Sequence, residues 1–374
     1  MQNLDTLLIH PDIKKNPLGA LAFPIFQTST YENEFMNEGK YSYSRCSNPT
    51  RTELERVAAL AENGKYCSAF SSGLSAINAV FSLVHSGEHI LVSADIYGGT
   101  YRLLNEFIKK NGITITFCDA SDTNKFCALL RPETTLVFIE TPTNPLMKVT
   151  DIYEISSKIG KKAILACDNT FLSPVFQKPL DLGADISIHS ATKYICGHHD
   201  TSAGLVITNN YDIAEKISFA LRTHGSGLSP FDSFLVRRGF ETLCLRMERH
   251  NQNSLKVFEF LTHCKEIEKI YYVGDKNHPD YAVTQKQTSG FGGMLSFVFC
   301  KGYEVKEFIN RLKLIIFAES LGGNSSLITH PYTQTHASLP VEVRLKNGIT
   351  PMLLRLSVGT ENANDIICDI KEAL

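Results

Sequence analysis

The sequence lacks a membrane-spanning segment and any concentration of positive charge. No uninterrupted apolar run approaches the roughly 20 residues of a spanning helix. The start, Met1-Gln2-Asn3-Leu4-Asp5, has no basic region followed by an apolar one, as a secretory signal would. Lys and Arg number 37 against 39 Asp and Glu, for a formal net charge of −2. We therefore expect a cytoplasmic protein whose partners are small molecules, not nucleic acid or a membrane.

The ten cysteines show no pairing pattern. They are dispersed from Cys46 to Cys368, and no CxxC pair occurs. Most lie among apolar or β-forming residues, which is typical of reduced cysteines used as small hydrophobic side chains. His198-His199-Asp200 has no further ligand at the spacing of a metal site, so we expect no metal.

The overall composition is that of a folded protein. Of its 374 residues, 43% are hydrophobic and 20% charged, as in ordinary globular proteins, and the length favours two or three domains. Short apolar runs alternate with helical patterns from residue 52 to 208, which predicts an α/β fold with a mostly parallel sheet. The predicted strands are 66–70, 89–93, 113–118, 135–139, 163–167, 186–189 and 205–208, and the predicted helices are 52–62, 74–85, 101–110 and 151–159.

The pattern changes after about residue 240. A long helical stretch precedes predicted strands near 293–299 and 352–358 and predicted helices near 303–313 and 363–373, which indicates a smaller α+β domain. The first 45 or so residues carry few periodic signals, as in an arm that packs on something else. We therefore expect an N-terminal arm at 1–45 that contacts a neighbouring subunit, a large domain at 46–240 and a small domain at 241–374.

Lys193 directly follows a predicted buried strand, in Ser190-Ala191-Thr192-Lys193-Tyr194. An unpaired ammonium is costly there. Nucleophilic chemistry is one good reason to keep it, since partial desolvation lowers the pKa of the amine. The neighbouring hydroxyls of Ser190 and Thr192 could donate to a phosphate. A lone lysine in such a place is more often a surface residue with a buried stem. The interpretation of Lys193 as a nucleophile therefore needs support from other residues of the same site.

Two other segments supply those partners. Asp168 lies at the end of the predicted strand 163–167, 25 residues before Lys193, and this spacing fits two neighbouring strand ends with one crossover between them. A carboxylate there can pair with a pyridinium nitrogen and keep it protonated. Alone, Asp168 would be a helix or turn cap. Ser72-Gly73-Leu74 opens an amphipathic helix, where backbone N–H groups of Gly73 and Leu74 can bind a phosphate. Together these residues predict a site for pyridoxal 5′-phosphate (PLP).

Ordered motifs resemble those of the Cys/Met-metabolism PLP enzymes, which include cystathionine γ-synthase, cystathionine γ-lyase, cystathionine β-lyase, methionine γ-lyase and O-acetylhomoserine sulfhydrylase. The resemblance runs from about residue 18 to the C-terminus, and it implies the PLP-dependent fold type I of aspartate aminotransferase. It is carried by Tyr41-Ser42-Tyr43-Ser44-Arg45, Asn48-Pro49-Thr50-Arg51, Ser71-Ser72-Gly73, Tyr97-Gly98-Gly99-Thr100-Tyr101-Arg102, Glu140-Thr141-Pro142-Thr143-Asn144-Pro145, Asp168-Asn169-Thr170-Phe171, Ser190-Ala191-Thr192-Lys193-Tyr194, Glu319-Ser320-Leu321-Gly322-Gly323 and Arg355-Leu356-Ser357-Val358-Gly359.

The resemblance implies a role for each cofactor residue. Lys193 would hold PLP as a Schiff base, and Tyr97 would stack on its ring and assist proton transfer. Asn144 would bond the phenolic oxygen, and Asp168 would pair with the ring nitrogen. The phosphate would be held by Gly73, Leu74, Ser190 and Thr192 and, from a neighbouring subunit, by Tyr43 and Arg45. We therefore expect a homo-oligomer, a homotetramer built as a dimer of dimers with shared sites.

The resemblance also implies a substrate site. Arg355 would clamp the α-carboxylate as a bidentate fork, although an arginine in a strand is more often an ordinary salt-bridge partner. Glu319, Ser320 and Glu140 would complete the site. β-Lyases usually carry an aromatic or apolar residue at the position of Glu319. An acidic residue there suits the distal ammonium of cystathionine or the exclusion of competing acids. Methionine γ-lyases usually carry a cysteine at the position of Gly99, so the glycine argues against that activity.

These features favour γ-replacement or γ-elimination in transsulfuration. The expected activity is that of cystathionine γ-synthase or γ-lyase, acting on O-acyl-homoserine with cysteine or on cystathionine. O-Acetylhomoserine sulfhydrylase, cystathionine β-lyase and methionine γ-lyase are the alternatives. A nucleotide-dependent oxidoreductase would need a GxGxxG after the first strand, which is missing. A non-catalytic PLP carrier would keep Lys193 and Asp168 without needing Arg355 or Glu319.

The chain departs from the family's usual sequence at four places, of which the changes at His199 and His224 bear on fine substrate specificity and not on the cofactor. They are His199 where Ser or Gly is frequent, Thr201-Ser202 after Asp200, Arg222-Thr223-His224 where Gln-Asn is common, and Tyr272-Val273-Gly274 where Tyr-Pro-Gly is usual.

Overall fold

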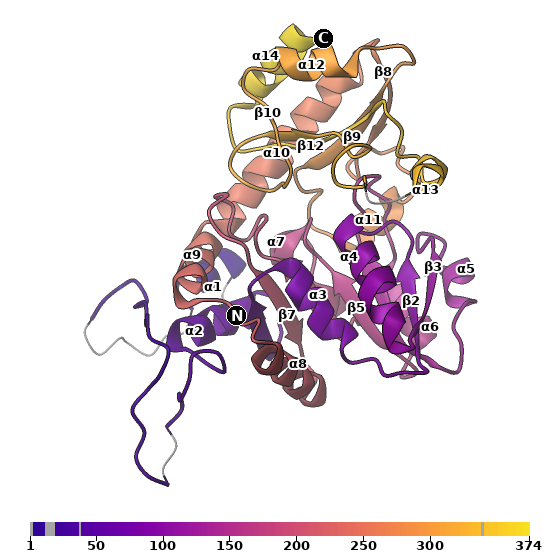
Figure 1. The fold of residues 1–374 in the computed structure, drawn as a ribbon. Helices are drawn as coiled ribbons and strands as arrows, with labels where there is room; N and C mark the ends of the chain where they lie inside the picture. The colour runs from indigo at the N-terminus through magenta and orange to yellow at the C-terminus, as the bar shows by residue number, and fades with distance from the viewer. Residues whose placement is uncertain (1–2, 12–18, 37–38, 338–339) are drawn as a thin grey trace.

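The computed structural model describes residues 3–11, 19–36, 39–337 and 340–374. Its strands form a seven-stranded sheet from residues 66–208 and a five-stranded sheet from residues 267–357. The two sheets lie in different halves of the molecule, and the long helix α10 (Leu243–Leu261) runs from one half into the other (Figure 1). The α/β fold expected from the sequence is confirmed.

The large sheet has the strand order β1-β7-β6-β5-β4-β2-β3. β7 runs antiparallel to both of its neighbours, and the other neighbouring pairs are parallel. The prediction of a mostly parallel sheet is therefore confirmed, and each predicted strand agrees with an observed one to within two residues at either end. The strands are β1 (Tyr66–Phe70), β2 (His89–Ser93), β3 (Thr114–Cys118), β4 (Thr134–Glu140), β5 (Ile164–Asp168), β6 (Ile186–Ser190) and β7 (Gly204–Thr208).

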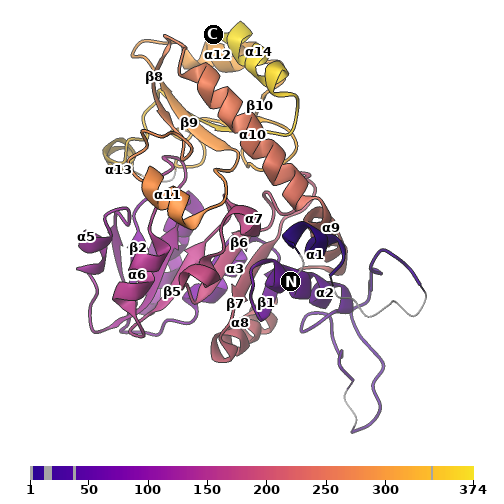
Figure 2. The same cartoon turned by 180° about the vertical axis from the view of Figure 1, so that it is seen from behind.

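Helices cover both faces of the large sheet, which explains why its central strands are buried at nearly every position. Figure 1 views the face covered by α3 (Gly73–Phe81), α4 (Gly98–Leu103) and α8 (Tyr211–His224), and Figure 2 views the face covered by α6 (Ile152–Ile159). α4 continues as a π-helical turn, Leu104–Ile108, and a 3₁₀ turn, Lys109–Asn111. The remaining helices of this half are α1 (Leu4–Ile9), α2 (Pro49–Ala61), α5 (Thr123–Cys127), α7 (Ser173–Phe176), the 3₁₀ turn Pro179–Leu182 and α9 (Pro230–Glu241).

The small sheet has the order β10-β11-β12-β9-β8. Leu354 and Leu356 of β12 pack in one core with α10, α12 (Val305–Arg311) and α14 (Ala363–Ala373). Residues of the other face turn toward the large sheet: Ser296 of β9 donates to the carbonyl of Pro145 at 2.7 Å. The strands are β8 (Ile267–Tyr271), β9 (Met294–Phe299), β10 (Ile316–Phe317), β11 (Leu327–Thr329) and β12 (Leu353–Ser357), and the other helices are α11 (Tyr281–Gln287) and α13 (Val341–Lys346).

The seven strands of the large sheet fall within the predicted range 46–240, and the five of the small sheet fall within 241–374. The limits of the predicted arm and domains stay a prediction. Part of the arm packs on its own chain, because Leu8 of α1 is buried in the core that also contains residues of α2 and α9. Within the described residues, no helix is long and apolar enough to cross a membrane.

Candidate active site

A cavity of about 250 Å³ opens where β4, β5 and β6 end. Carboxyl ends of parallel strands meet at one edge of a sheet, so residues far apart in sequence converge there. The structure brings together twelve of the predicted site residues, all but Tyr43 and Arg45. The twelve are Gly73, Leu74, Tyr97, Glu140, Asn144, Asp168, Ser190, Thr192, Lys193, Glu319, Ser320 and Arg355.

Lys193 lies in the turn that follows β6, and its side chain is directed at the small half of the molecule. Its Nζ lies 3.0 Å from Oγ of Ser320. Burial and the positive charge of Arg355 lower the pKa of Lys193 to about 8, while Glu319 opposes the change. Ser320 itself has a φ of 90°, in the region that favours glycine, and such backbone strain is common at functional sites. Near neutral pH this amine is therefore partly unprotonated and nucleophilic.

Asp168 is the last residue of β5, beside β6 in the sheet. This confirms the prediction that the strands before Asp168 and Lys193 are neighbours. The backbone N–H and the hydroxyl of Thr170 donate to Oδ1 of Asp168 at 3.0 and 2.5 Å. The same hydroxyl accepts from the N–H of Ser190 at 2.9 Å. Burial raises the pKa of Asp168, and the bonds from Thr170 oppose that change.

Glu140 ends β4 and stands opposite Asp168 in the sheet register. Its Oε2 accepts from the backbone N–H of Tyr97 at 2.9 Å. Burial, and then the charge of Asp168, raise the pKa of Glu140 well above its usual range. Tyr97 is 42% exposed and lines the cavity, where an aromatic ring can stack on a planar ligand. The observed contact of Glu140 is thus with Tyr97, and its direct contact with substrate stays a prediction.

The N-terminus of α3 comes unusually close to the end of β6. Ser72 caps the helix by accepting from the N–H of Ser75 at 3.1 Å. A Cβ added at Gly73 would lie 2.7 Å from Cβ of Ser190, so only glycine permits this approach. The N–H groups of Gly73 and Leu74 at the helix start form a cradle suited to an anion. The hydroxyl of Thr192 is already bonded to the backbone of Ala203, at 3.2 and 2.9 Å.

Arg355 lies in β12 and reaches across to the large sheet. Its Nη1 donates to Oδ1 of Asn144 at 3.0 Å, and its Nη2 donates to the carbonyl of Ser320 at 2.8 Å and to Thr329 at 3.1 Å. Burial lowers its pKa to about 10, which leaves it a cation at neutral pH. Its buried Nε has no partner among the described residues. A fixed guanidinium with a free donor is suited to a carboxylate ligand.

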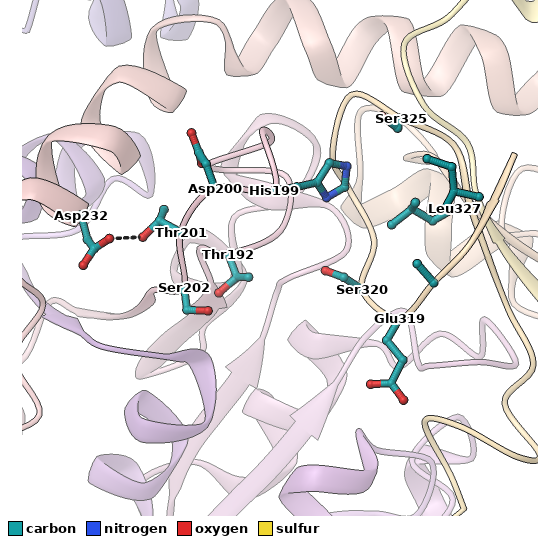
Figure 3. Close-up of a pocket in the computed structure, with 12 residues that line it drawn as sticks. Thr192, His199, Asp200, Thr201, Ser202, Asp232, Glu319, Ser320, Ser325 and Leu327 are labelled. Carbon is teal, nitrogen blue, oxygen red and sulfur yellow. Dashed lines mark hydrogen bonds between the residues drawn. The ribbon is translucent and has the colours of Figure 1, made fainter. Parts of the chain in front are cut away.

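A larger hollow, of about 740 Å³, adjoins the cavity and shares Thr192, Ser202, Glu319 and Ser320 with it. Figure 3 shows Glu319 and Ser320 on one wall and the loop from His199 to Ser202 on the other. On that loop Thr201 donates to Asp232 at 2.6 Å. Two of the departures from the family's usual sequence, at His199 and at Thr201-Ser202, therefore line this outer hollow, and Ser202 also lines the inner cavity.

Tyr43 and Arg45 do not line the cavity of their own chain. They lie between α1 and α2, in a segment whose described parts project away from the large sheet (Figure 1). Nη1 of Arg45 donates to the carbonyl of Arg222 at 2.5 Å, and Tyr43 is exposed. Their predicted contact with the phosphate of a neighbouring subunit stays a prediction.

Sequence reasoning missed residues that line or support the cavity. Thr170 was part of a quoted motif, and its position two residues after Asp168 marks it as a side chain that bonds back to the carboxylate. Ser202 and Thr335 also line the cavity. Thr335 stands in no motif, so nothing in the sequence indicates its place.

Comparisons with known proteins decide the family. A model of the family described as Cys/Met metabolism PLP-dependent enzyme matches residues 5–374. The chain belongs to this family. The enzyme therefore uses PLP, and its substrates are small amino acids of cysteine and methionine metabolism.

Relatives of this family member extend over its full length. A cystathionine β-lyase of Lactococcus lactis subsp. cremoris is 47% identical, with 100% of this chain and 99% of the relative covered. A cystathionine γ-lyase of Bacillus subtilis is 46% identical, with 99% and 98% covered. The solved structure of cystathionine γ-lyase from Lactobacillus plantarum, complexed with L-serine, superposes with a TM-score of 0.97 at 42% identity and covers 100% and 98%. The predicted fold type I architecture is thereby confirmed.

The cavity fits PLP in its chemistry. The close approach at Gly73 leaves a helix N-terminus for a phosphate, Lys193 supplies an amine of lowered pKa, and Asp168 supplies a buried, hydrogen-bonded carboxylate. These are the three kinds of group that a phosphorylated pyridine aldehyde requires.

Proposed function

We propose that the enzyme makes or breaks the γ carbon–sulfur bond of cystathionine, by γ-replacement or γ-elimination. The observation that carries the proposal is that Glu319 borders both the cavity with Lys193 and Arg355 and the outer hollow. A substrate with an α-carboxylate at Arg355 can thus extend past Glu319 into the larger space. PLP, when bound, supplies an electron sink for the reaction.

The side chains of the cavity have separate tasks in this proposal. Arg355 binds the substrate α-carboxylate, and its bonds to Asn144 and Ser320 orient the guanidinium. Lys193, whose pKa is lowered, takes the proton from Cα of the substrate and later returns a proton to the substrate. Ser320, 3.0 Å from Nζ, holds the amine in place. Tyr97 assists the proton transfers. Asp168 faces the ring nitrogen of PLP.

Glu319 selects among the reactions of the family. Its carboxylate attracts the distal ammonium of cystathionine, or that of cysteine as an incoming thiol. A substrate without that ammonium gains nothing from the contact. Synthesis and cleavage of cystathionine would both use the contact of Glu319 with this ammonium, so the proposal includes both directions.

The β-lyase reaction is the second candidate, because relatives of nearly the same identity carry that name. The two cleavages differ in their products. Breaking the γ bond of cystathionine gives cysteine, ammonia and a four-carbon keto acid, whereas breaking the β bond gives homocysteine, ammonia and pyruvate.

The test is to incubate purified enzyme with cystathionine alone, and with O-acetyl- or O-succinyl-homoserine plus cysteine or sulfide. Keto acids and thiols are then identified by chromatography and mass spectrometry. The proposal expects the four-carbon keto acid with cysteine, or cystathionine from the homoserine esters. Pyruvate and homocysteine as the main products from cystathionine alone would replace it with the β-lyase reaction.

The assembly proposed with this function is a homo-oligomer, a tetramer of two dimers, in which Tyr43 and Arg45 of one chain complete the phosphate site of the next. The exposure of Tyr43 supports it, as does the fact that neither residue lines the cavity of its own chain. The cytoplasmic location stays a prediction.

A further inference from the structure

Glu62 is a buried carboxylate that the proposed reaction does not use. It follows α2, and it is fully buried. Its Oε1 accepts from three side chains: Nε2 of His189 at 2.5 Å, Oγ of Ser187 at 3.1 Å and Nδ2 of Asn169 at 3.2 Å. Its Oε2 is buried without a partner among the described residues. Three donors on one oxygen are typical of an ionised carboxylate, which only accepts.

Two of these three donors, Asn169 and His189, lie at the strand ends that build the cofactor cavity, and the third, Ser187, lies further back in β6. Asn169 directly follows Asp168 at the end of β5, and His189 directly precedes Ser190 at the end of β6. On the cavity side the same two strand ends are joined again, because Thr170 bonds both Asp168 and the N–H of Ser190. Glu62 therefore holds, from beneath, the two strand ends that carry Asp168 and lead to Lys193.

A buried anion needs a countercharge, since an isolated one is very costly. His189 is the one side chain able to become a cation that bonds Glu62 among the described residues, and it is itself 1% exposed. The other ionisable groups around the pair are acidic: Glu62 raises the pKa of both Cys67 and Cys167, and Asp168 also raises that of Cys167. The charge of His189 in turn lowers the pKa of Asp168.

We propose that Glu62 and His189 form an ion pair beneath the cavity that keeps Asp168 a carboxylate facing the ring nitrogen of PLP. Both are positioning residues, which act through Asp168 and touch neither cofactor nor substrate. The inference rests on the proposed pairing of Asp168 with that nitrogen. If Glu62 had only a structural role, it would hold its three donors in place without affecting whether Asp168 prefers a ring nitrogen to a ring C–H.

The test compares binding of PLP with binding of 1-deaza-PLP, in which a C–H replaces the ring nitrogen. The measured quantity is the ratio of the two dissociation constants for apoenzyme, from equilibrium dialysis. General damage to the site weakens both ligands and cancels in the ratio. Glu62→Gln keeps the size of the side chain and removes its charge. Glu55→Gln is the matched control, because Glu55 is a carboxylate of α2 that instead accepts from the N–H of Ala69.

We expect Glu62→Gln to shift the ratio against PLP roughly tenfold, equivalent to about one pKa unit at Asp168, and Glu55→Gln to leave it within twofold. The double variant Glu62→Gln/His189→Gln removes both charges together and should show the same shift, which covers the case that the single variant folds poorly. An unchanged ratio in the folded variants would overturn the inference.

Asp168→Asn separates this inference from the function on which it rests. If Asp168→Asn shifts the ratio and the Glu62 variants do not, the ion pair is structural and Asp168 keeps its role. If Asp168→Asn also leaves the ratio unchanged, the pairing of Asp168 with the ring nitrogen is wrong, and the inference fails with it.

Discussion

Burial sets the chemistry of individual side chains in this enzyme. Lys193 has a pKa of about 8 because it is buried near Arg355, and an ordinary lysine titrates near 10.4. Its amine therefore becomes neutral about two pH units earlier than a surface amine. Asp168 and Glu140 are buried acids whose pKa values are raised. The same desolvation thus favours the neutral form of the base and of both acids.

This shift predicts how Lys193 reacts in apoenzyme. Only the neutral amine is nucleophilic, so its rate of acylation should rise with pH and level off above about pH 8. The acylation rate of exposed Lys125, whose pKa is raised by Asp122, should still increase with pH above pH 8. Competitive labelling with trace acetic anhydride, read by peptide mass spectrometry across pH 6–11, measures both at once. A midpoint for Lys193 equal to that of Lys125 would contradict the burial argument.

Glu319 gives the second prediction at this scale. Glu319→Ala should lower kcat/KM for cystathionine about 5- to 150-fold, or about 1–3 kcal/mol, since a bond to a charged group is lost. The lower end is expected because the carboxylate is exposed to the outer hollow. Sulfide-dependent turnover of homoserine esters should change much less.

The control for Glu319 is Glu307→Ala, an exposed carboxylate of α12 paired with Arg311. It should leave both reactions within twofold. Equal small losses on both substrates in Glu319→Ala would remove the reason for ranking the cystathionine γ reactions first.

Much of the cavity could be predicted at the residue scale. Asp168 ends one short, buried strand and Lys193 closely follows another, and parallel neighbours place such positions side by side. The engagement of Thr192 with Ala203 and of Glu140 with Tyr97 could not be predicted, because both depend on tertiary contacts between distant segments. Thr335 was missed for the same reason.

At the scale of elements, the contact between α3 and β6 fixes the helix N-terminus that we propose binds the phosphate. Gly73→Ala would place a Cβ 2.7 Å from Cβ of Ser190, within the range that real contacts avoid. The helix must then move away from the strand, and we expect the dissociation constant of PLP to rise at least tenfold. Ser75→Ala, two residues further along the same helix, is the control and should bind PLP normally. Normal binding by Gly73→Ala would show that the cradle does not need this approach.

The strands of the large sheet were predicted more reliably than those of the small sheet. β2 is buried at every position and its predicted limits agree with those observed, whereas β8, β10 and the three-residue β11 were not predicted. β8 carries the exposed Glu268 and Lys269, and β10 has two residues, both exposed, so neither shows a hydrophobic pattern. α8 was also missed, although Asn210 caps its start and Gly225 ends it in the left-handed region.

At the scale of the whole molecule, the cavity is assembled from both halves and, in the proposed oligomer, from two chains. Arg355 and Ser320 come from the small half, and Lys193 and Asp168 come from the large half. Their alignment depends on contacts such as that of Ser296 with Pro145. The order of motifs predicted which residues meet, but the outer hollow depends on how the halves pack and could not be read from sequence.

Shared sites predict complementation between inactive variants. Arg45→Ala should weaken PLP retention, and Lys193→Ala should abolish turnover while still binding PLP non-covalently. Refolding the two together should restore part of the activity, because some hybrid sites then contain both Arg45 and Lys193. The control mixes Asp168→Ala with Lys193→Ala, two residues of one cavity, which should restore much less. No recovery in hybrids verified by mass spectrometry would count against sites shared between chains.

The most direct measurement for the whole account is the identity of the lysine that holds PLP. Holoenzyme is reduced with borohydride, digested, and its pyridoxyl peptides are mapped by mass spectrometry. The account predicts one labelled peptide, with the label on Lys193, and no such peptide from Lys193→Ala. A label on any other lysine of the native enzyme would contradict the site on which every proposed role depends.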